Sequence, residues 1–447
     1  MNRKTWATAV LVMFSMQLSA QKIDRKAVVT RHNPHITQID SLSSLTVGNG
    51  AFAFTVDATG LQTFPEKYRK GVCLGTFSDN AWHSFPNDNN YTEQDAWVEK
   101  DFGRGHKEIY AAQFKQKGRQ QDASNYLRNN PHRLHLGNIG LALSDPDKVK
   151  DIDQTLDLWT GKITSSFTYE DQKYNVQTVC SPDHDLIATR VESDNDFALT
   201  FRFAYPTGGH ADDACDWTKD ELHETSYTSV KNRCVVKRIV DGTTYYLHLM
   251  WKGNARISRD GRNALRLSCK KGNIQLQCEF TLSESRQAMH LQPFSDWYMA
   301  SAGRWANYWN SGGIIDFGHV KDPRARELER RVVLSQYLMG AQECGPQPPQ
   351  ETGLTYNSWY GKFHLEMTWW HLTHYGLWGR AELLDLPLTW YRKAAHNARQ
   401  IAKRQGFKGI RWMKMTDPEA GEAPSNVGSY LIWQQPHLIY LAELIYR

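Results

Sequence analysis

The sequence predicts a multidomain chain with a large β-sandwich first and a helical region after it. Between about Ser44 and Leu282, apolar and polar residues alternate, which is the pattern of strands that bury one face. After Pro293 the apolar residues, among them Trp297 and Trp305, recur at roughly helical spacing instead. The 447 residues are enough for about two to four domains of ordinary size, so each part can hold a core of its own.

The composition is that of an ordinary globular protein and narrows the range of partners. Hydrophobic residues make up 40% and charged residues 23%, which excludes a disordered chain. The 53 basic and 48 acidic residues leave a formal charge of only +5, so we expect no nucleic-acid partner. The 16 Trp favour a carbohydrate ligand, because sugars pack against flat aromatic faces, although most of these rings are expected in the core.

Residues 1–20 have the order of a secretory signal peptide. Arg3 and Lys4 come first, an apolar stretch over 6–16 follows, and small residues end at Ala20. We expect cleavage after Ala20 and a periplasmic or secreted mature protein. The apolar stretch is shorter than the ~20 residues that span a membrane, and no later stretch reaches that length, so no membrane insertion is predicted.

The β-sandwich domain is expected over residues 27–290. Strands over 163–169 and 174–180 flank polar turn residues as one hairpin. Strands over 265–269 and 274–280 flank a Lys-Lys-Gly-Asn turn as another. Many short strands with turn residues between them favour two packed antiparallel sheets.

No metal or cofactor site is predicted. The seven cysteines are an odd number without a C-x-x-C pair, so at least one is unpaired. We expect most of them to be buried as small apolar side chains, and the sequence leaves the pairing of one or two possible disulfides open. Residues 209–216 include metal-ligand types without a recognised spacing, and we interpret them as a loop that reaches towards the helical region. No phosphate loop, nucleophile elbow or nicotinamide motif is present in the sequence.

A helical linker is expected over residues 291–321 and a helical domain over 322–447. Asp322 and Pro323 supply an N-cap and a first-turn proline for the first domain helix. The last helix is still amphipathic at Arg447, where the chain stops, so we expect the natural domain to be cut short. The further helices are predicted over 363–378, 387–405 and 431–446.

Three blocks of this sequence, 45–54, 353–370 and 406–422, resemble the six-hairpin glycosidases and in particular glycoside hydrolase family 65. The resemblance implies an N-terminal β-sandwich, a helical linker and an (α/α)6 barrel whose loops hold the active site. This order agrees with the order expected from the residue patterns. Only part of such a barrel is present, so the resemblance implies a partial barrel that is truncated within its catalytic domain.

The first barrel block contains the candidate sugar ligand Glu366. The resemblance implies that this block binds the sugar at the cleavage point, although Leu365 and Glu366 stand where the family usually has Trp-Asp. From chemistry alone, Glu366 shares a helical face with Phe363, Met367 and Trp370, and a carboxylate there needs a partner. A sugar and a buried ion pair both meet that need. The other predicted sugar ligands in this block are Trp359, Tyr360, Lys362 and His364.

The last block contains the candidate general acid, Glu422. Gly409, Trp412 and Gly421 match the order that the family shows before its glutamate, and Met413-Lys414-Met415 replaces its Pro-Trp pattern. An inverting glycosidase needs an acid with a raised pKa and a base that activates water, and aromatic burial raises such a pKa. The base lies in later barrel helices of the family, beyond this chain. The alternatives that remain open for Glu422 are Asp417 or Glu419 as the acid and a solvated loop role for Glu422 itself.

These observations favour an exported glycoside hydrolase that cleaves an oligosaccharide by inversion and needs no cofactor. Trp412 and Gln434 are further predicted sugar ligands, and His371 and His374 are either sugar ligands or core residues. An α-linked substrate follows only from the resemblance, and the sequence leaves the sugar, the linkage and the oligomeric state open. The alternative is a non-catalytic carbohydrate-binding protein or an inactive truncated hydrolase.

Overall fold

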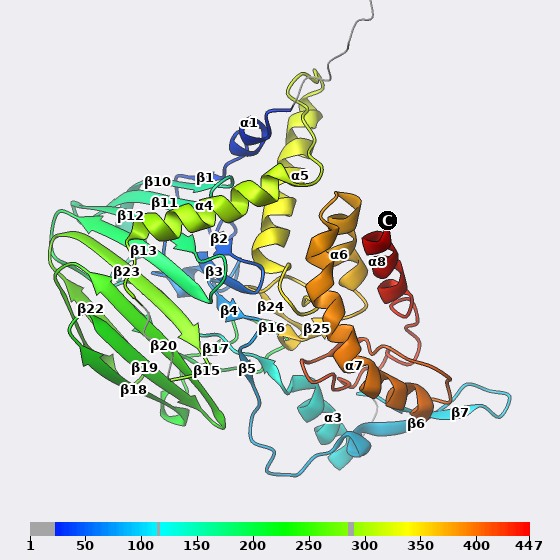
Figure 1. Cartoon of the computed structure of the whole chain (residues 1–447). Helices are drawn as coiled ribbons and strands as arrows, with labels where there is room; N and C mark the ends of the chain where they lie inside the picture. Colours follow the sequence, from blue (N-terminus) through cyan, green and yellow to red (C-terminus); the bar gives the residue numbers. More distant parts are fainter. Residues whose placement is uncertain (1–22, 114–116, 285–289) are drawn as a thin grey trace, which may run out of the picture.

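The first part of the chain folds into two packed antiparallel sheets. A computed structural model describes residues 23–113, 117–284 and 290–447, and the predicted signal peptide lies outside them. Within these residues, nine strands form the larger sheet in the order β1-β10-β11-β12-β13-β23-β20-β19-β18 (Figure 1). Four strands form the smaller sheet in the order β21-β22-β14-β9. The strands of the two sheets are β1 (His35–Ile36), β9 (Asn138–Leu141), β10 (Val149–Asp157), β11 (Lys162–Tyr169), β12 (Gln172–Cys180), β13 (Leu186–Ser193), β14 (Phe197–Arg202), β18 (His223–Val230), β19 (Arg233–Val240), β20 (Thr243–Lys252), β21 (Ala255–Gly261), β22 (Ala264–Cys269) and β23 (Gly272–Thr281).

The core of the sandwich lies between these sheets because their strands alternate buried and half-buried side chains. In β11 the alternation is complete, with every second residue buried. Phe167, Val191 and Trp251 of the larger sheet join Leu199 and Leu267 of the smaller sheet in one apolar cluster. Burying each of these side chains contributes roughly 1.5–3 kcal/mol.

One of the two predicted hairpins is confirmed and the other is wrong. β11 and β12 pair from Tyr169 and Gln172 outwards, and the two turn residues between them, Glu170 and Asp171, have φ of 47° and 66°. The second pair of strands exists, but β22 pairs with β14 and β21, whereas β23 pairs with β13 and β20. The chain therefore crosses from one sheet to the other at Gly272 instead of turning back in the same sheet.

The second part of the chain is mainly helical, so the predicted order of a β-rich part and then a helical part is confirmed. α4 packs along β11, β12 and β13 on the outer face of the larger sheet (Figure 1). α5 begins where predicted, because the Asp322 side chain accepts a hydrogen bond from the Arg324 N–H at 2.9 Å. The helices of this part are α4 (Phe294–Asn310), α5 (Pro323–Gln342), α6 (Thr368–Leu377), α7 (Asp385–Arg404) and α8 (His437–Tyr446).

Two predicted helices begin later than expected. The helix predicted from residue 363 begins at Thr368, because Phe363 and His364 form a short strand instead. The helix predicted from residue 431 begins at His437. The smaller strands are β5 (Trp82–His83), which pairs with β8 (His132–Arg133); β15 (Tyr205–Pro206), with β17 (Cys215–Asp216); β16 (Ala211–Asp212), with β24 (Asn357–Ser358); and β25 (Phe363–His364), with β26 (Met415–Thr416).

A three-stranded sheet joins the β-rich part to α5. It consists of β2 (Leu45–Gly48), β3 (Phe52–Val56) and β4 (Thr76–Ser78). The buried Tyr337 hydroxyl of α5 donates to the Thr46 carbonyl at 3.0 Å. A Cβ on Gly48 would lie 2.2 Å from the Ala341 carbonyl oxygen, so only glycine permits this close approach. The first block of the family resemblance therefore forms an interface with α5.

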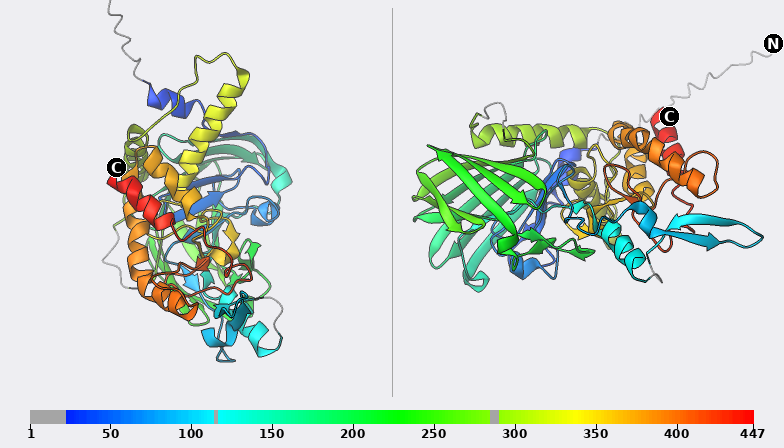
Figure 2. Two further views of the ribbon diagram at one scale, coloured as in Figure 1. Left: turned by 90° about the vertical axis from the view of Figure 1, so that its right-hand side faces the viewer. Right: turned by 90° about the horizontal axis from the view of Figure 1, so that it is seen from below.

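A segment of the β-rich part projects along the helical part. It contains η1 (Glu93–Ala96), β6 (Trp97–Asp101), β7 (Lys107–Ala111) and α3 (Arg119–Asn129), and its hairpin extends past α7 (Figures 1 and 2). The Arg128 Nη1 of α3 donates to the Pro424 carbonyl at 2.7 Å. This insert therefore contributes side chains to the surface of the helical part. The remaining short helices are α1 (Arg25–Thr30), α2 (Pro65–Tyr68), η2 (Pro146–Lys148), η3 (Asp220–Leu222), η4 (Trp359–Gly361) and η5 (Ala381–Leu384).

Most of the cysteines are buried, as expected from the sequence. All seven cysteines lie in the described part of the chain as free thiols, and each is buried except Cys344, which is partly exposed. Over the residues that the structure describes, no helix combines the length and the apolar character needed to cross a membrane.

Candidate active site

The two barrel blocks predicted from the sequence lie side by side in a small sheet. Phe363 of β25 pairs with Thr416 of β26, and His364 pairs with Met415. Glu422 continues this sheet, because it forms a bridge with Thr416. Residues that are about 50 positions apart in sequence are thus brought into contact at one end of the helical part.

The turn before β25 has an unusual backbone. Trp359, Tyr360 and Gly361 have φ of 50°, 64° and 66°, so three successive residues are left-handed. Each such non-glycine residue costs of order 1–3 kcal/mol, and strain of this kind concentrates at functional sites. Arg133 packs against the turn, and a Cβ on Gly361 would lie 2.4 Å from the Arg133 Cβ. We refer to residues 359–366 as the Trp359 turn.

Four basic side chains surround the indole of Trp359. The His364 ring stacks on it with centroids 5.3 Å apart and planes at 21°. The Lys414 Nζ lies 4.3 Å from the ring centroid, and the Arg128 guanidinium lies 5.3 Å from it. His210 approaches the ring edge-on at 4.3 Å. The indole is therefore the centre of a cluster of hydrogen-bond donors that come from both parts of the chain.

Glu366 is the acidic member of this cluster. Its Oε1 lies 2.5 Å from the Lys414 Nζ and 3.2 Å from the His364 Nε2. Burial alone would raise its pKa, but hydrogen bonds from His364 and Lys414 outweigh burial and lower the pKa to about 2. Of the two interpretations of Glu366, the buried ion pair is present in the structure. The ionised carboxylate remains a strong hydrogen-bond acceptor.

Lys362, another predicted sugar ligand, is fixed by the protein itself. Its Nζ donates to the Asn130 carbonyl at 3.0 Å and lies 3.9 Å from Asp417. Burial lowers the pKa of Lys362 to about 8. Asp417 in turn accepts hydrogen bonds from the Glu419 and Gly421 N–H groups. These contacts hold the insert against the loop after β26.

Trp412 and Gln434 face the protein interior. Trp412 is buried in an apolar cluster with Phe363 and Tyr391. The Gln434 side chain donates to the Trp412 carbonyl at 3.3 Å, and it is itself buried. Both residues support the loop that contains Lys414.

Glu422, the predicted general acid, lies on the other face of the small sheet from His364. Side chains of paired residues share a face and alternate along a strand, so Glu422 shares its face with Thr416 and Phe363. On this face its carboxylate forms an ion pair with Arg404 of α7. Burial raises the pKa of Glu422, and Arg404 opposes the rise. The structure therefore does not bring the two predicted carboxylates, Glu366 and Glu422, together.

Three residues of the Trp359 cluster were not predicted from the sequence as ligands: Lys414, Arg128 and His210. Lys414 appeared only as a departure from the family pattern. Arg128 and His210 lie 231 and 149 residues before Trp359 in the sequence, and no local pattern links them to it. A fourth residue that was not predicted, Glu351, lies beside the cluster, since its Oε2 lies 3.5 Å from the His364 Nδ1.

The loop over residues 209–216 reaches the helical part, as predicted. Ala211 of β16 pairs with Ser358 of β24, directly before the Trp359 turn. Asp212 accepts a hydrogen bond from Asn357 at 3.2 Å, and Asp213 forms an ion pair with Arg69 at 2.7 Å. In the described residues, no group of three or more His, Cys, Asp or Glu side chains is placed to hold a metal ion.

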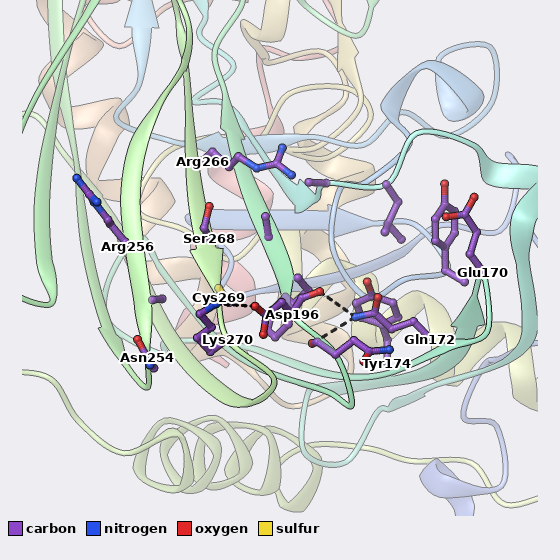
Figure 3. A pocket seen from close by; sticks show the side chains of 17 residues that line it. Glu170, Gln172, Tyr174, Asp196, Asn254, Arg256, Arg266, Ser268, Cys269 and Lys270 are labelled. Carbon is purple, nitrogen blue, oxygen red and sulfur yellow. Dashed lines mark hydrogen bonds and ion pairs between the residues drawn. The ribbon is translucent and has the colours of Figure 1, made fainter.

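A polar hollow of about 570 Å³ lies far from these residues, at the open end of the sandwich (Figure 3). Gln172 and Tyr174 of β12 form one side of it, and Arg266 and Lys270 lie on the other. Asp196 pairs with Lys270 at 2.8 Å, so charges in this hollow already compensate one another. It contains none of the site residues predicted from the sequence.

Comparison with known proteins shows a similarity between the β-rich part and one known family. Residues 78–244 match the model of the glycosyl hydrolase family 65, N-terminal domain. No curated protein matches the chain. Among solved structures, a protein from the human microbiome named as a kojibiose phosphorylase is 11% identical, with a TM-score of 0.59. The match covers 91% of this chain and 54% of that one, so the chain spans about half the length of that structure.

A second solved structure, a bacterial glucoamylase in complex with acarbose, is 9% identical with a TM-score of 0.44, and the match covers 93% of this chain and 59% of that one. The first of these likenesses shows a shared fold, in which a β-rich part precedes a helical part. The resemblance of this chain to glycoside hydrolase family 65 is therefore confirmed, and the match to the N-terminal domain of that family covers residues 78–244.

Proposed function

We propose that this chain binds an oligosaccharide at the Trp359 turn and takes part in cleaving a glycosidic bond. The observation that carries the proposal is the ionised Glu366 held by Lys414 and His364 beside the indole of Trp359. Sugar hydroxyls need both acceptors and donors, and an aromatic face binds the C–H face of the ring. Glu366 supplies the acceptor, and Lys414 and Arg128 supply donors.

The strained backbone of the turn supports the same site. Left-handed residues at Trp359 and Tyr360 persist only where the surroundings determine the conformation. Here the surroundings are the Arg133 contact, the Lys362 anchor and the stacking of His364. These contacts, and not the strain, therefore keep the aromatic rings in a defined position before a ligand binds.

The proposed reaction is hydrolysis with inversion in an exported protein. Inversion needs an acid and a base whose carboxyl groups are about 6.5–9.5 Å apart on opposite sides of the bond. With a pKa of about 2, Glu366 is suited to holding a sugar hydroxyl and not to donating a proton. Glu422 has the raised pKa that an acid requires, and it stays the predicted acid, but the bond that it protonates would lie on its own face of the sheet.

The separation of these two carboxylates favours one second candidate function. If no acid faces the sugar at Glu366, the Trp359 turn binds an oligosaccharide without cleaving it. The non-catalytic carbohydrate-binding protein is therefore the alternative to the glycosidase.

Three isosteric substitutions distinguish these functions. Kojibiose and maltose are suitable probes, with binding measured by titration calorimetry and cleavage by release of glucose. Glu366→Gln is expected to lose binding, and Glu422→Gln to lose cleavage while it keeps binding. Glu224→Gln is the matched control, because Glu224 is an exposed residue of β18 at the edge of the larger sheet.

The outcomes separate the two proposals. If Glu422→Gln cleaves as fast as the unchanged protein, the acid assignment is wrong. If the unchanged protein binds sugar at Glu366 and releases no glucose, the binding function replaces the glycosidase. Failure of every probe to bind would overturn the sugar site at the Trp359 turn.

A further inference from the structure

A second hollow of about 570 Å³ lies between the projecting insert and α7. Its walls come from three stretches that are far apart in sequence: η1 with the start of β6, the second half of α7, and the loop before Glu422. This volume is within the roughly 300–1,000 Å³ of small-molecule sites. We call it the Trp97 groove, and its lining residues are Glu93, Gln94, Trp97, Asn397, Gln400, Ile401, Lys403, Arg404, Ala420 and Glu422.

We propose that the Trp97 groove is a second saccharide-binding site, separate from the Trp359 turn. Trp97, the Arg404 and Glu422 pair, and the amide side chains of the groove would contact the sugar. This inference rests on the proposed function in taking an oligosaccharide as the ligand, and the groove shares Glu422, the predicted acid, with that function.

The aromatic wall of the groove is Trp97. The Arg404 guanidinium lies 5.0 Å from the centroid of its ring, and Arg404 is held there by the ion pair with Glu422. Trp97 is half-buried, so part of its indole borders the groove. An indole beside a fixed guanidinium and carboxylate offers an apolar face, donors and acceptors in one place, which is what a sugar ring requires.

The amide side chains of the groove have hydrogen-bonding capacity left. Gln94 and Gln400 are exposed, and neither side chain has a hydrogen-bond partner within the described residues. Asn397 uses its Nδ2 towards the Glu419 and Ala420 carbonyls, which leaves its Oδ1 as an acceptor. Amide groups of this kind match sugar hydroxyls because each can donate and accept.

Two side chains of the groove each contain a buried donor that no group in the described part of the chain satisfies. Over the described residues, the Trp97 Nε1 and the Arg404 Nε are buried without a hydrogen-bond partner. Buried polar groups are normally paired, and leaving one unpaired costs free energy. Both donors belong to the side chains that form the groove.

The charges of the groove favour a neutral ligand. Glu93 and Glu422 balance Lys403 and Arg404, so neither a phosphate nor a cation is preferred. Arg404 and Glu422 already neutralise one another. An uncharged, hydroxyl-rich ligand fits such a balanced polar lining best, and an oligosaccharide has these properties.

Removal of Trp97 tests the groove, and removal of Trp359 is the matched control at the other site. Maltoheptaose and kojibiose are titrated against the full chain by calorimetry, which resolves two classes of site in the unchanged protein if the inference holds. Trp97→Ala should weaken the saccharide affinity of one class of site about tenfold or more and leave the affinity of the other class unchanged. Trp359→Ala should do the reverse.

A milder variant keeps the test valid if Trp97→Ala fails to fold, which far-ultraviolet circular dichroism would reveal. Gln400→Ala removes one exposed amide from the same groove and leaves the core untouched. It should weaken only the class that Trp97→Ala removes. If the folded Trp97 and Gln400 variants bind both probes as the unchanged protein does, the inference is overturned.

The two proposals fail in different ways. If only Trp359→Ala loses binding, the proposed function is supported and the Trp97 groove is not a saccharide site. If only Trp97→Ala loses binding, the groove is a saccharide site and the proposed sugar site at the Trp359 turn is wrong. No binding of either saccharide by the unchanged protein would overturn both.

Discussion

Lys414 and Glu366 form a buried ion pair where the two barrel blocks meet, with the Lys414 Nζ 2.5 Å from the Glu366 Oε1. Only 6% of the Lys414 side chain and 11% of the Glu366 side chain are exposed, so water screens the pair weakly. The His364 ring joins them, since its Nε2 lies 2.7 Å from the Lys414 Nζ. One contact therefore determines both the stability of the site and the charge that it presents to a ligand.

Removing the carboxylate should destabilise the fold. Glu366→Gln leaves the Lys414 ammonium buried without its anion, and breaking such a pair costs about 3–5 kcal/mol. Urea unfolding followed by tryptophan fluorescence measures the loss. Adding Lys414→Met to Glu366→Gln should recover part of it, and a double variant as unstable as the sum of the single variants would contradict the coupling.

The same pair predicts an acid-sensitive fold. Glu366 has a pKa of about 2 in the folded chain against an ordinary value of 4.5. Its contribution to stability is therefore complete above pH 4.5 and is lost as the pH falls from 4.5 towards 2. Unfolding free energies at pH 6, 4.5 and 3 should show a steeper loss for the unchanged protein than for Glu366→Gln. Parallel curves would mean that Glu366 is not held as an anion.

Much of this site could not be predicted from the sequence because its partners are distant along the chain. A carboxylate on the apolar side of residues 363–370 required a partner, but the sequence left sugar and ion pair open. The partner, Lys414, lies 48 residues later and reaches Glu366 only because β25 pairs with β26. That same pairing turned the expected first helical turn at Phe363 into a strand.

The position of Glu422 depends on the pleat of a strand that is two residues long. The family resemblance implies that Glu366 binds the sugar at the cleavage point and that Glu422 is the acid, but the bridge to Thr416 puts the Glu422 side chain on the face of Phe363 and α7. The β-rich part was easier to predict, since alternation in a strand such as β11 is a local signal. The local sequence does not determine which sheet a strand joins, and the predicted pairing of β22 with β23 was wrong for that reason.

Glu343 predicts a second, alkaline change in stability. Burial raises the pKa of this carboxyl to about 8, against an ordinary value of 4.5, and the His371 Nδ1 lies 3.9 Å from the carboxylate. Burial lowers the pKa of His371 to about 4, so His371 is neutral and does not compensate. The folded chain holds the Glu343 proton more tightly than the unfolded chain does.

The sign of that effect follows from linkage. A raised pKa gives stability that is complete below pH 4.5 and is lost as the pH rises towards 8. Glu343→Gln mimics the protonated carboxyl, so it should remove most of the decline in unfolding free energy between pH 5 and pH 8. Urea unfolding at both values measures it. An equal decline in the variant would show that Glu343 is ionised in the folded protein.

The left-handed turn at Gly361 provides the last prediction. Its φ is 66°, and a methyl group added there would lie only 2.4 Å from the Arg133 Cβ, so alanine strains the backbone and collides with a buried side chain. Gly361→Ala should therefore lower the unfolding free energy by about 1–3 kcal/mol and weaken saccharide binding at the neighbouring Trp359. Gly242→Ala is the matched control, because no atom lies within 4 Å of its methyl position, and it should change the stability by less than about 0.5 kcal/mol. Equal stability of the two variants would mean that the turn relaxes freely and does not hold the aromatic rings in place.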